Sequence, residues 1–192
     1  MKRLMAALFA STLLLAACGG SDSGGSSSAS DFNDADVTFV QGMIPHHEQA
    51  VEMADLALKN ADSEDVRALA EQIKGAQDPE IKAMKGFLED WGKEESKDSG
   101  GMDGMGESEM GDSGSTGMMS DEEMADLEAA SGAEFDKMFL EMMMEHHEGA
   151  ISMAETERAD GESSDAKDLA GKIIKAQKAE ITEMKALLES GV

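Results

Sequence analysis

Tyrosine is absent from this sequence of 192 residues, and cysteine and tryptophan occur only once each. A single cysteine cannot form an intramolecular disulfide, so no such bond holds this fold together. Structural zinc sites combine cysteine with histidine, so that kind of site is disfavoured too. Because aromatic residues are scarce, we expect a core of Leu, Ile, Val, Ala and Met.

Basic residues are also few: 16 Lys and Arg stand against 41 Asp and Glu, for a net charge of −25 at pH 7. A surface of this charge repels nucleic acid and anionic lipid and attracts cations. The sequence therefore predicts no nucleic-acid partner. Nothing in it resembles a nucleophile–base pair or a nucleotide-binding loop, so we expect a protein that is not an enzyme.

The apolar run at residues 4–16 is too short to cross a bilayer as a helix, which takes about 20 residues. Lys2 and Arg3 precede it, an arrangement typical of a secretory signal peptide. The run ends in Leu-Ala-Ala-Cys18, which resembles a bacterial lipobox. The resemblance implies a lipoprotein signal peptide over residues 1–17 and lipidation of Cys18.

The residues after this cysteine are mostly Gly and Ser, so residues 18–33 are expected to be a lipidated cysteine with a flexible tether. The expected location is the cell envelope, lipid-anchored and extracytoplasmic, in the periplasm or on the outer surface of the membrane. The lipid anchor is then the only predicted contact with the membrane.

One block of sequence occurs twice, with an offset of 100 residues. A duplicated structural unit is the simplest explanation. The residues that recur 100 positions later are Phe39, Met43, His46, His47, Glu48, Ala50, Met53, Ala54, Leu69, Ala70, Ile73, Ala76, Gln77, Glu80, Ile81, Met84, Lys85, Leu88 and Glu89.

Apolar residues in each copy recur at helical spacing and predict two helices. The first helical hairpin is placed at 34–91 and the second at 121–190, with helices near 121–159 and 163–189. Residues 92–120 are rich in Met, Gly and Asp and lack apolar periodicity, so they are predicted to be a disordered linker. Two hairpins that each expose an apolar face predict an all-α, four-helix bundle with pseudo-twofold symmetry.

Local signals refine the first hairpin. Asp34 or Asp36 could cap the start of its first helix, and Ser63 with Glu64 opens the second. Pro45 lies inside the first helix, where it removes a backbone hydrogen bond, so a kink is expected just before the histidines.

All four histidines form two adjacent pairs at equivalent positions of the repeat. At about 100° per residue, the helical spacing places these imidazoles on or beside the inward face, together with thioethers. Imidazole suits copper, zinc, iron and nickel, whereas thioether selects soft ions such as Cu(I). The candidate metal ligands are His46, His47, His146, His147, Met43, Met53, Met143, Met153, Met84 and Met184.

Ligating histidines usually have their second ring nitrogen held by an acceptor. The partner helices offer repeated polar residues for this role, namely Gln77, Glu80, Gln177 and Glu180. The Glu-x-x-His motif of di-iron bundles is missing, because methionine or isoleucine stands three residues before each histidine. Methionines of the predicted linker form a candidate auxiliary metal site: Met102, Met105, Met110, Met118 and Met119.

The region around the first histidine pair resembles the domain-of-unknown-function family numbered 305, which includes CopM-like exported copper-binding proteins. The second copy has Met144 and Glu145 where the family motif has Ile and Pro. The resemblance covers most of residues 34–190 and implies a ferritin-like bundle that binds copper. The residues that carry it are Met43, Pro45, His46, His47, Ala50, Met53 and Ala54 in the first copy and Met143, His146, His147, Ala150, Met153 and Ala154 in the second.

The predicted function is therefore binding of copper, preferably Cu(I) with Cu(II) also accepted by the histidines, for metal sequestration, tolerance or delivery. A copper-handling protein is a candidate partner, and the oligomeric state stays open. Two alternatives remain. A bundle can hold a b-type haem between Met and His, which a Soret band would reveal. Alternatively, the histidines are structural and the bundle is a non-metal interaction module.

Overall fold

The computed structural model describes residues 31–96 and 117–192, which form five helices and no strand. The predicted signal peptide, Cys18 and most of the tether and linker lie outside the described residues. The helices are α1 (Asp34–Asn60), α2 (Glu64–Trp91), α3 (Asp121–Ala129), α4 (Gly132–Asp160) and α5 (Ser164–Ser190). None of the described helices combines the length and apolar character needed to span a membrane.

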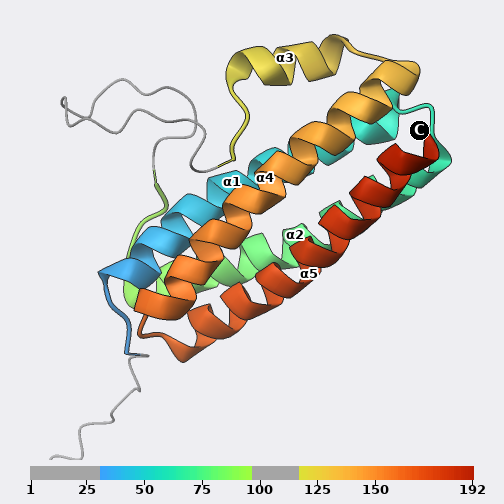
Figure 1. Cartoon of the computed structure of the whole chain (residues 1–192). Coiled ribbons are helices and arrows are strands. Elements are labelled where there is room, and N and C mark those ends of the chain that lie inside the picture. Colours follow the sequence, from blue (N-terminus) through green and yellow to red (C-terminus); the bar gives the residue numbers. More distant parts are fainter. Residues whose placement is uncertain (1–30, 97–116) are drawn as a thin grey trace, which may run out of the picture.

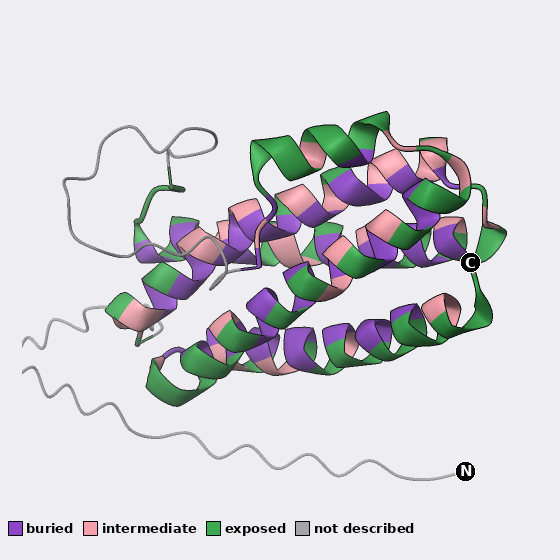
Figure 2. Cartoon of the chain, turned by 45° about the horizontal axis from the view of Figure 1, so that its top comes forward, coloured by how far each residue is buried: buried purple, intermediate pink, exposed green. Residues whose placement is uncertain are grey.

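The four long helices form one bundle (Figure 1). α1 and α2 make one hairpin, α4 and α5 make the other, and the hairpins join through contacts of α1 with α4 and of α2 with α5. The buried positions of each long helix gather on its inner side, and the exposed positions face outward (Figure 2). The predicted all-α bundle of two repeated hairpins is confirmed.

The start of α1 differs from its prediction. Asn33 is the N-cap: its side-chain oxygen accepts hydrogen bonds from the backbone N–H groups of Ala35 (2.7 Å) and Asp36 (3.2 Å). The Asp36 carboxylate accepts in return from the Asn33 N–H (2.6 Å), which completes a capping box. The predicted cap at Asp34 or Asp36 is therefore wrong, by one residue or by three. The helix continues through Pro45 to Asn60, and Ser63 caps α2 as predicted.

The predicted single helix at 121–159 is wrong, because the chain breaks between α3 and α4. Ala130 and Ser131 are extended, and Gly132 has a φ of 66°, a conformation that glycine adopts without a steric penalty. α3 consequently leaves the line of α4 and lies along the outside of the bundle (Figure 1). Its buried residue is Leu127.

Two aspartates fasten the hairpins to one another. Asp36 on α1 accepts hydrogen bonds from the backbone N–H groups of Glu162 (3.1 Å) and Ser163 (2.9 Å), in the loop before α5. Asp136 on α4 accepts from those of Asp62 (3.1 Å) and Ser63 (2.9 Å), in the loop before α2. We call these reciprocal contacts of Asp36 and Asp136 the hairpin clasps.

Residues 117–119, which the sequence assigns to the linker, lie against α1 and α4. The backbone N–H of Met119 donates to the side-chain oxygen of Gln49 on α1 (2.8 Å), and the Gln49 amide donates to the Met119 carbonyl (2.8 Å). The Met119 side chain is buried among the core residues. We call residues 117–119 the strap.

Candidate metal centre

The four histidines lie in the bundle interior, on α1 and α4, and none has an exposed side chain. The ring centroids of His46 and His146 are 3.7 Å apart, across the contact between the two helices. Within each pair the centroids are 6.5 Å (His46–His47) and 6.4 Å (His146–His147) apart. The imidazoles therefore form a row in the order His47, His46, His146, His147, which we call the imidazole row.

Helical geometry explains why both members of each pair are buried. Successive residues point about 100° apart around the helix axis. On α1, His46 meets His146 of α4, while His47 meets Glu80 of its own hairpin partner α2. A helix with neighbours on two sides can bury two adjacent side chains in this way.

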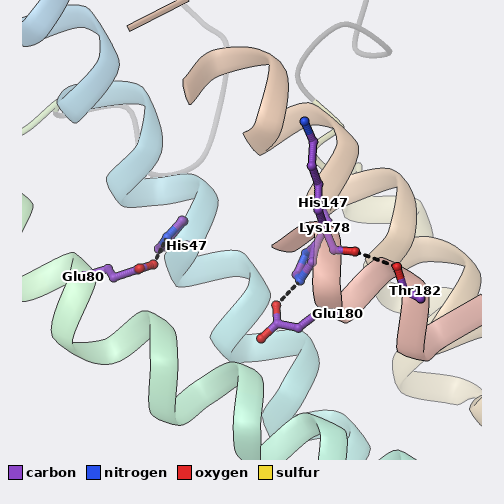
Figure 3. A network of polar contacts seen from close by, with 6 residues as sticks. All are labelled: His47, Glu80, His147, Lys178, Glu180 and Thr182. Carbon is purple, nitrogen blue, oxygen red and sulfur yellow. Dashed lines mark hydrogen bonds and ion pairs between the residues drawn. The ribbon is translucent and has the colours of Figure 1, made fainter. Parts of the chain in front are cut away.

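Carboxylates hold the two outer imidazoles (Figure 3). The Nε2 atom of His47 lies 2.9 Å from Oε2 of Glu80, and that of His147 lies 2.7 Å from Oε2 of Glu180. These are the carboxylates that the sequence singles out as acceptors. Because an ionised carboxylate only accepts hydrogen bonds, the Nε2 atom of each outer imidazole carries the proton and donates it, and the tautomer that fits this contact has Nδ1 unprotonated. The lone pair is then on Nδ1.

The Nδ1 atoms of His47 and His147 are buried and have no hydrogen-bond partner among the described residues. The side-chain amides of Gln77 and Gln177 are also buried without a hydrogen-bond partner among the described residues. Buried polar atoms are normally satisfied, and those that are not call for an explanation. A buried Nδ1 lone pair whose Nε2–H is held by a carboxylate is the arrangement found in histidines that bind metals.

The interior favours the neutral form of His146. Burial lowers the pKa of His146 well below its usual value, and the nearby imidazoles of His46, His147 and His47 lower it further. A neutral imidazole keeps its lone pair for a ligand at pH 7. Binding of a metal there would therefore not have to displace a proton.

The candidate methionines separate into two groups. Five are fully buried in the core: Met43, Met53, Met84, Met143 and Met184. Met153 and Met118 are half-buried. Of the other predicted auxiliary ligands, Met119 is in the core, whereas Met102, Met105 and Met110 lie outside the described residues.

The donor set narrows the kind of metal that could be held. Among the residues that the structure describes, no group of three or more His, Cys, Asp or Glu side chains is arranged as a metal site. A site built from three or more of these four residue types is therefore not preformed in the described part of the chain. The buried groups include imidazole nitrogens and thioether sulfurs, a combination that fits a soft ion such as Cu(I).

Sequence reasoning missed the hairpin clasps, which set the relative position of the two hairpins and so of the imidazole row. Asp36 and Asp136 are separated by the repeat offset of 100 residues. They could have been found as a repeated acidic residue three positions before a repeated phenylalanine.

Comparison with known proteins gives consistent matches. The family described as domain of unknown function DUF305 matches residues 36–188. A DUF305 protein from Streptomyces coelicolor, described as a candidate secreted protein, is 32% identical with a TM-score of 0.71, over 82% of this chain and 93% of that one. A DUF305 fragment from Deinococcus radiodurans is 27% identical with a TM-score of 0.70, over 82% and 97% of the two chains.

CopM in its Cu(II)-bound form is 30% identical with a TM-score of 0.68, over 82% of this chain and 97% of that chain. CopM structures in Cu(I)-bound, Ag-bound and apo forms also match. No curated protein matches this chain.

Proposed function

Because this chain belongs to the DUF305 family, we propose that it binds copper at the cell envelope and serves in sequestration, tolerance or delivery of the metal, without catalysis. The family match confirms the resemblance noted in the sequence. The observation that carries the proposal is the imidazole row, with the unpartnered Nδ1 atoms of His47 and His147 in an interior that also holds buried thioethers.

The chemistry of the donors favours Cu(I). Thioether sulfur needs no deprotonation, and burial favours the neutral form of His146, so the site would bind a soft cation over a wide pH range. Cu(II) would be held by the histidines in preference to the thioethers. The Cu(II)- and Cu(I)-bound forms of CopM, at 30% and 29% identity, support copper as the ligand.

The proposed setting follows from the ends of the chain and its charge. Residues 1–17 would direct export, and Cys18 would carry the lipid that anchors the protein outside the cytoplasm. A net charge of −25 would raise the local concentration of cations around the bundle. A copper-handling protein would then supply the metal or receive it.

Changing all four histidines to alanine should weaken Cu(I) binding by at least about 100-fold. Mutation of outer-shell partners alone typically lowers metal affinity about 10–100-fold, so loss of the ligands themselves should do more. The measurement is competitive Cu(I) titration of residues 31–192, with helicity checked by circular dichroism.

A second variant guards against misfolding, since His47→Leu with His147→Leu keeps the two outer positions filled while removing their nitrogens. Weaker binding by this folded protein supports the proposal. Equal binding by the wild type and both histidine variants would place the site at the methionines, and no binding by the wild type would overturn the copper proposal.

Changing Glu80 and Glu180 together to glutamine should weaken Cu(I) binding by about 10–100-fold. Glutamine keeps the size of the side chain but removes the charge that holds the Nε2–H of each outer histidine. The exposed residues Glu89 and Glu189 are a repeated pair on the same two helices, so their change to glutamine is a matched control. If the Glu89 and Glu189 variant loses as much Cu(I) affinity as the Glu80 and Glu180 variant, the effect comes from the surface charge and not from the contacts with the histidines.

A further inference from the structure

A pocket of ≈ 340 Å³ lies beside the imidazole row. Its lining includes His46 and Pro45 on α1, Met153 on α4 and Met118 in the strap. His46 is buried, whereas both methionines are half-buried. Two thioethers at the surface and one imidazole thus border the same space.

The strap fixes the position of Met118 from both sides. After it, Met119 is bound to Gln49 through the two hydrogen bonds described above. Before it, Gly117 has a φ of 68°, and a Cβ there would come within 2.5 Å of the Glu145 carbonyl oxygen and 3.1 Å of the Gly149 Cα. Only glycine fits this approach, so the chain is held close to α4 where it presents Met118.

Met153 owes its position to a glycine on the opposite helix. A Cβ at Gly42 would lie 3.0 Å from the terminal methyl carbon of Met153, so the missing side chain leaves room for this thioether against α1. The equivalent residue of the second repeat is Met142. Glu145 likewise stands at the position equivalent to Pro45. The two repeats therefore differ at these two positions beside the pocket.

We propose that Met118, Met153 and His46 form an entry site for a soft monovalent ion, Cu(I) or Ag(I), which passes from there to the rest of the imidazole row. This inference rests on the proposed function and adds the route by which the ion reaches the interior. Thioether sulfur binds soft ions without releasing a proton, so capture and transfer are ligand exchanges with no change of oxidation state. The mixed sulfur and nitrogen set also discriminates against hard cations that the acidic surface attracts.

The test uses Ag(I), which does not change oxidation state, and the full chain with ¹³C-labelled methionine methyl groups followed by NMR. At the first substoichiometric addition, the methyl resonances of Met118 and Met153 should shift. That of Met124, a half-buried methionine on α3 away from this pocket, should not. Met118→Leu should weaken the first binding event at least about tenfold, because a direct ligand matters at least as much as an outer-shell partner. The same change should slow the later shift of Met84 and Met184, and Met124→Leu is the matched control.

Early shifts of Met84 and Met184, with Met118 unchanged, would overturn the entry site and leave the proposed function standing. First shifts at Met102, Met105 and Met110 would also overturn it and place capture in the linker. No response to Ag(I) or Cu(I) anywhere in the chain would remove the entry site and the proposed function together.

Discussion

Asp136→Ala is expected to lower the free energy of unfolding by about 2–4 kcal/mol, because two backbone N–H groups lose a charged acceptor. The Asp136 side chain is only 2% exposed, so water cannot readily replace it. The measurement is urea denaturation followed by circular dichroism. Glu134→Ala, at an exposed carboxylate on the same helix, is the matched control and should stay within about 0.5 kcal/mol of the wild type.

The same loss is expected for Asp36→Ala, which removes the other clasp. Burial raises the pKa of Asp36, but hydrogen bonds from the backbone of Asn33, Glu162 and Ser163 outweigh it, and the pKa is lowered. The stabilisation by Asp36 is therefore present above its unfolded pKa and is lost as the pH falls through the lowered folded pKa. If Asp136→Ala and Asp36→Ala both change the free energy of unfolding as little as Glu134→Ala does, the clasps do not fasten the hairpins.

Glu157 should make the protein less stable as the pH rises from 5 to 8. Its side chain is 1% exposed, and burial beside Asp36 raises its pKa from 4.5 to about 8. The nearby Asp36 carboxylate disfavours a second negative charge at this buried position. Between the two pKa values the folded state holds a proton that the unfolded state has lost, so the free energy of unfolding falls with rising pH.

Glu157→Ala should remove this dependence. Alanine is already present at the equivalent buried position of the first repeat, Ala57. Between pH 5 and pH 8, the free energy of unfolding of the variant should rise relative to that of the wild type by more than about 1.4 kcal/mol. This is the free energy that corresponds to a pKa shift of one unit. His146, with its lowered pKa, acts in the opposite direction below pH 6.5, but it is present in both proteins and cancels in the difference.

Urea denaturation at pH 5, 6.5 and 8 measures the effect, again with Glu134→Ala as the exposed control. Parallel pH profiles for the wild type and Glu157→Ala would contradict the assignment of the proton to Glu157.

The fold could be predicted because the sequence contains its helices twice. The repeat offset and the helical spacing of apolar residues define two similar hairpins, and burial of their apolar faces leaves few arrangements. The same spacing indicated that the histidines face inward. The repeat also brought Glu80 and Glu180 into consideration, since the partner helix of each copy carries a glutamate at this position.

The crossing of the two hairpins could not be predicted in this way. Helical spacing tells which face of α1 is buried, but not which residue of α4 is opposite, so the 3.7 Å contact between His46 and His146 was not foreseen. The break at Gly132 was missed because one glycine inside an apolar periodic stretch is a weak signal. The strap was missed because its contacts depend on Gln49 and Gly149, which are far away in the sequence.

The hairpin clasps also bear on how such a chain arose. In a twofold symmetric dimer each contact occurs twice, with residue i of one subunit meeting residue j of the other and the reverse. Asp36 with the loop before α5 and Asp136 with the loop before α2 follow this rule within one chain. A lone ancestral hairpin would therefore satisfy both clasps by pairing with a second copy of itself, with one histidine from each subunit meeting at the symmetry axis. Gene duplication and fusion would then have freed the two halves to diverge, as Glu157 and Ala57 have done.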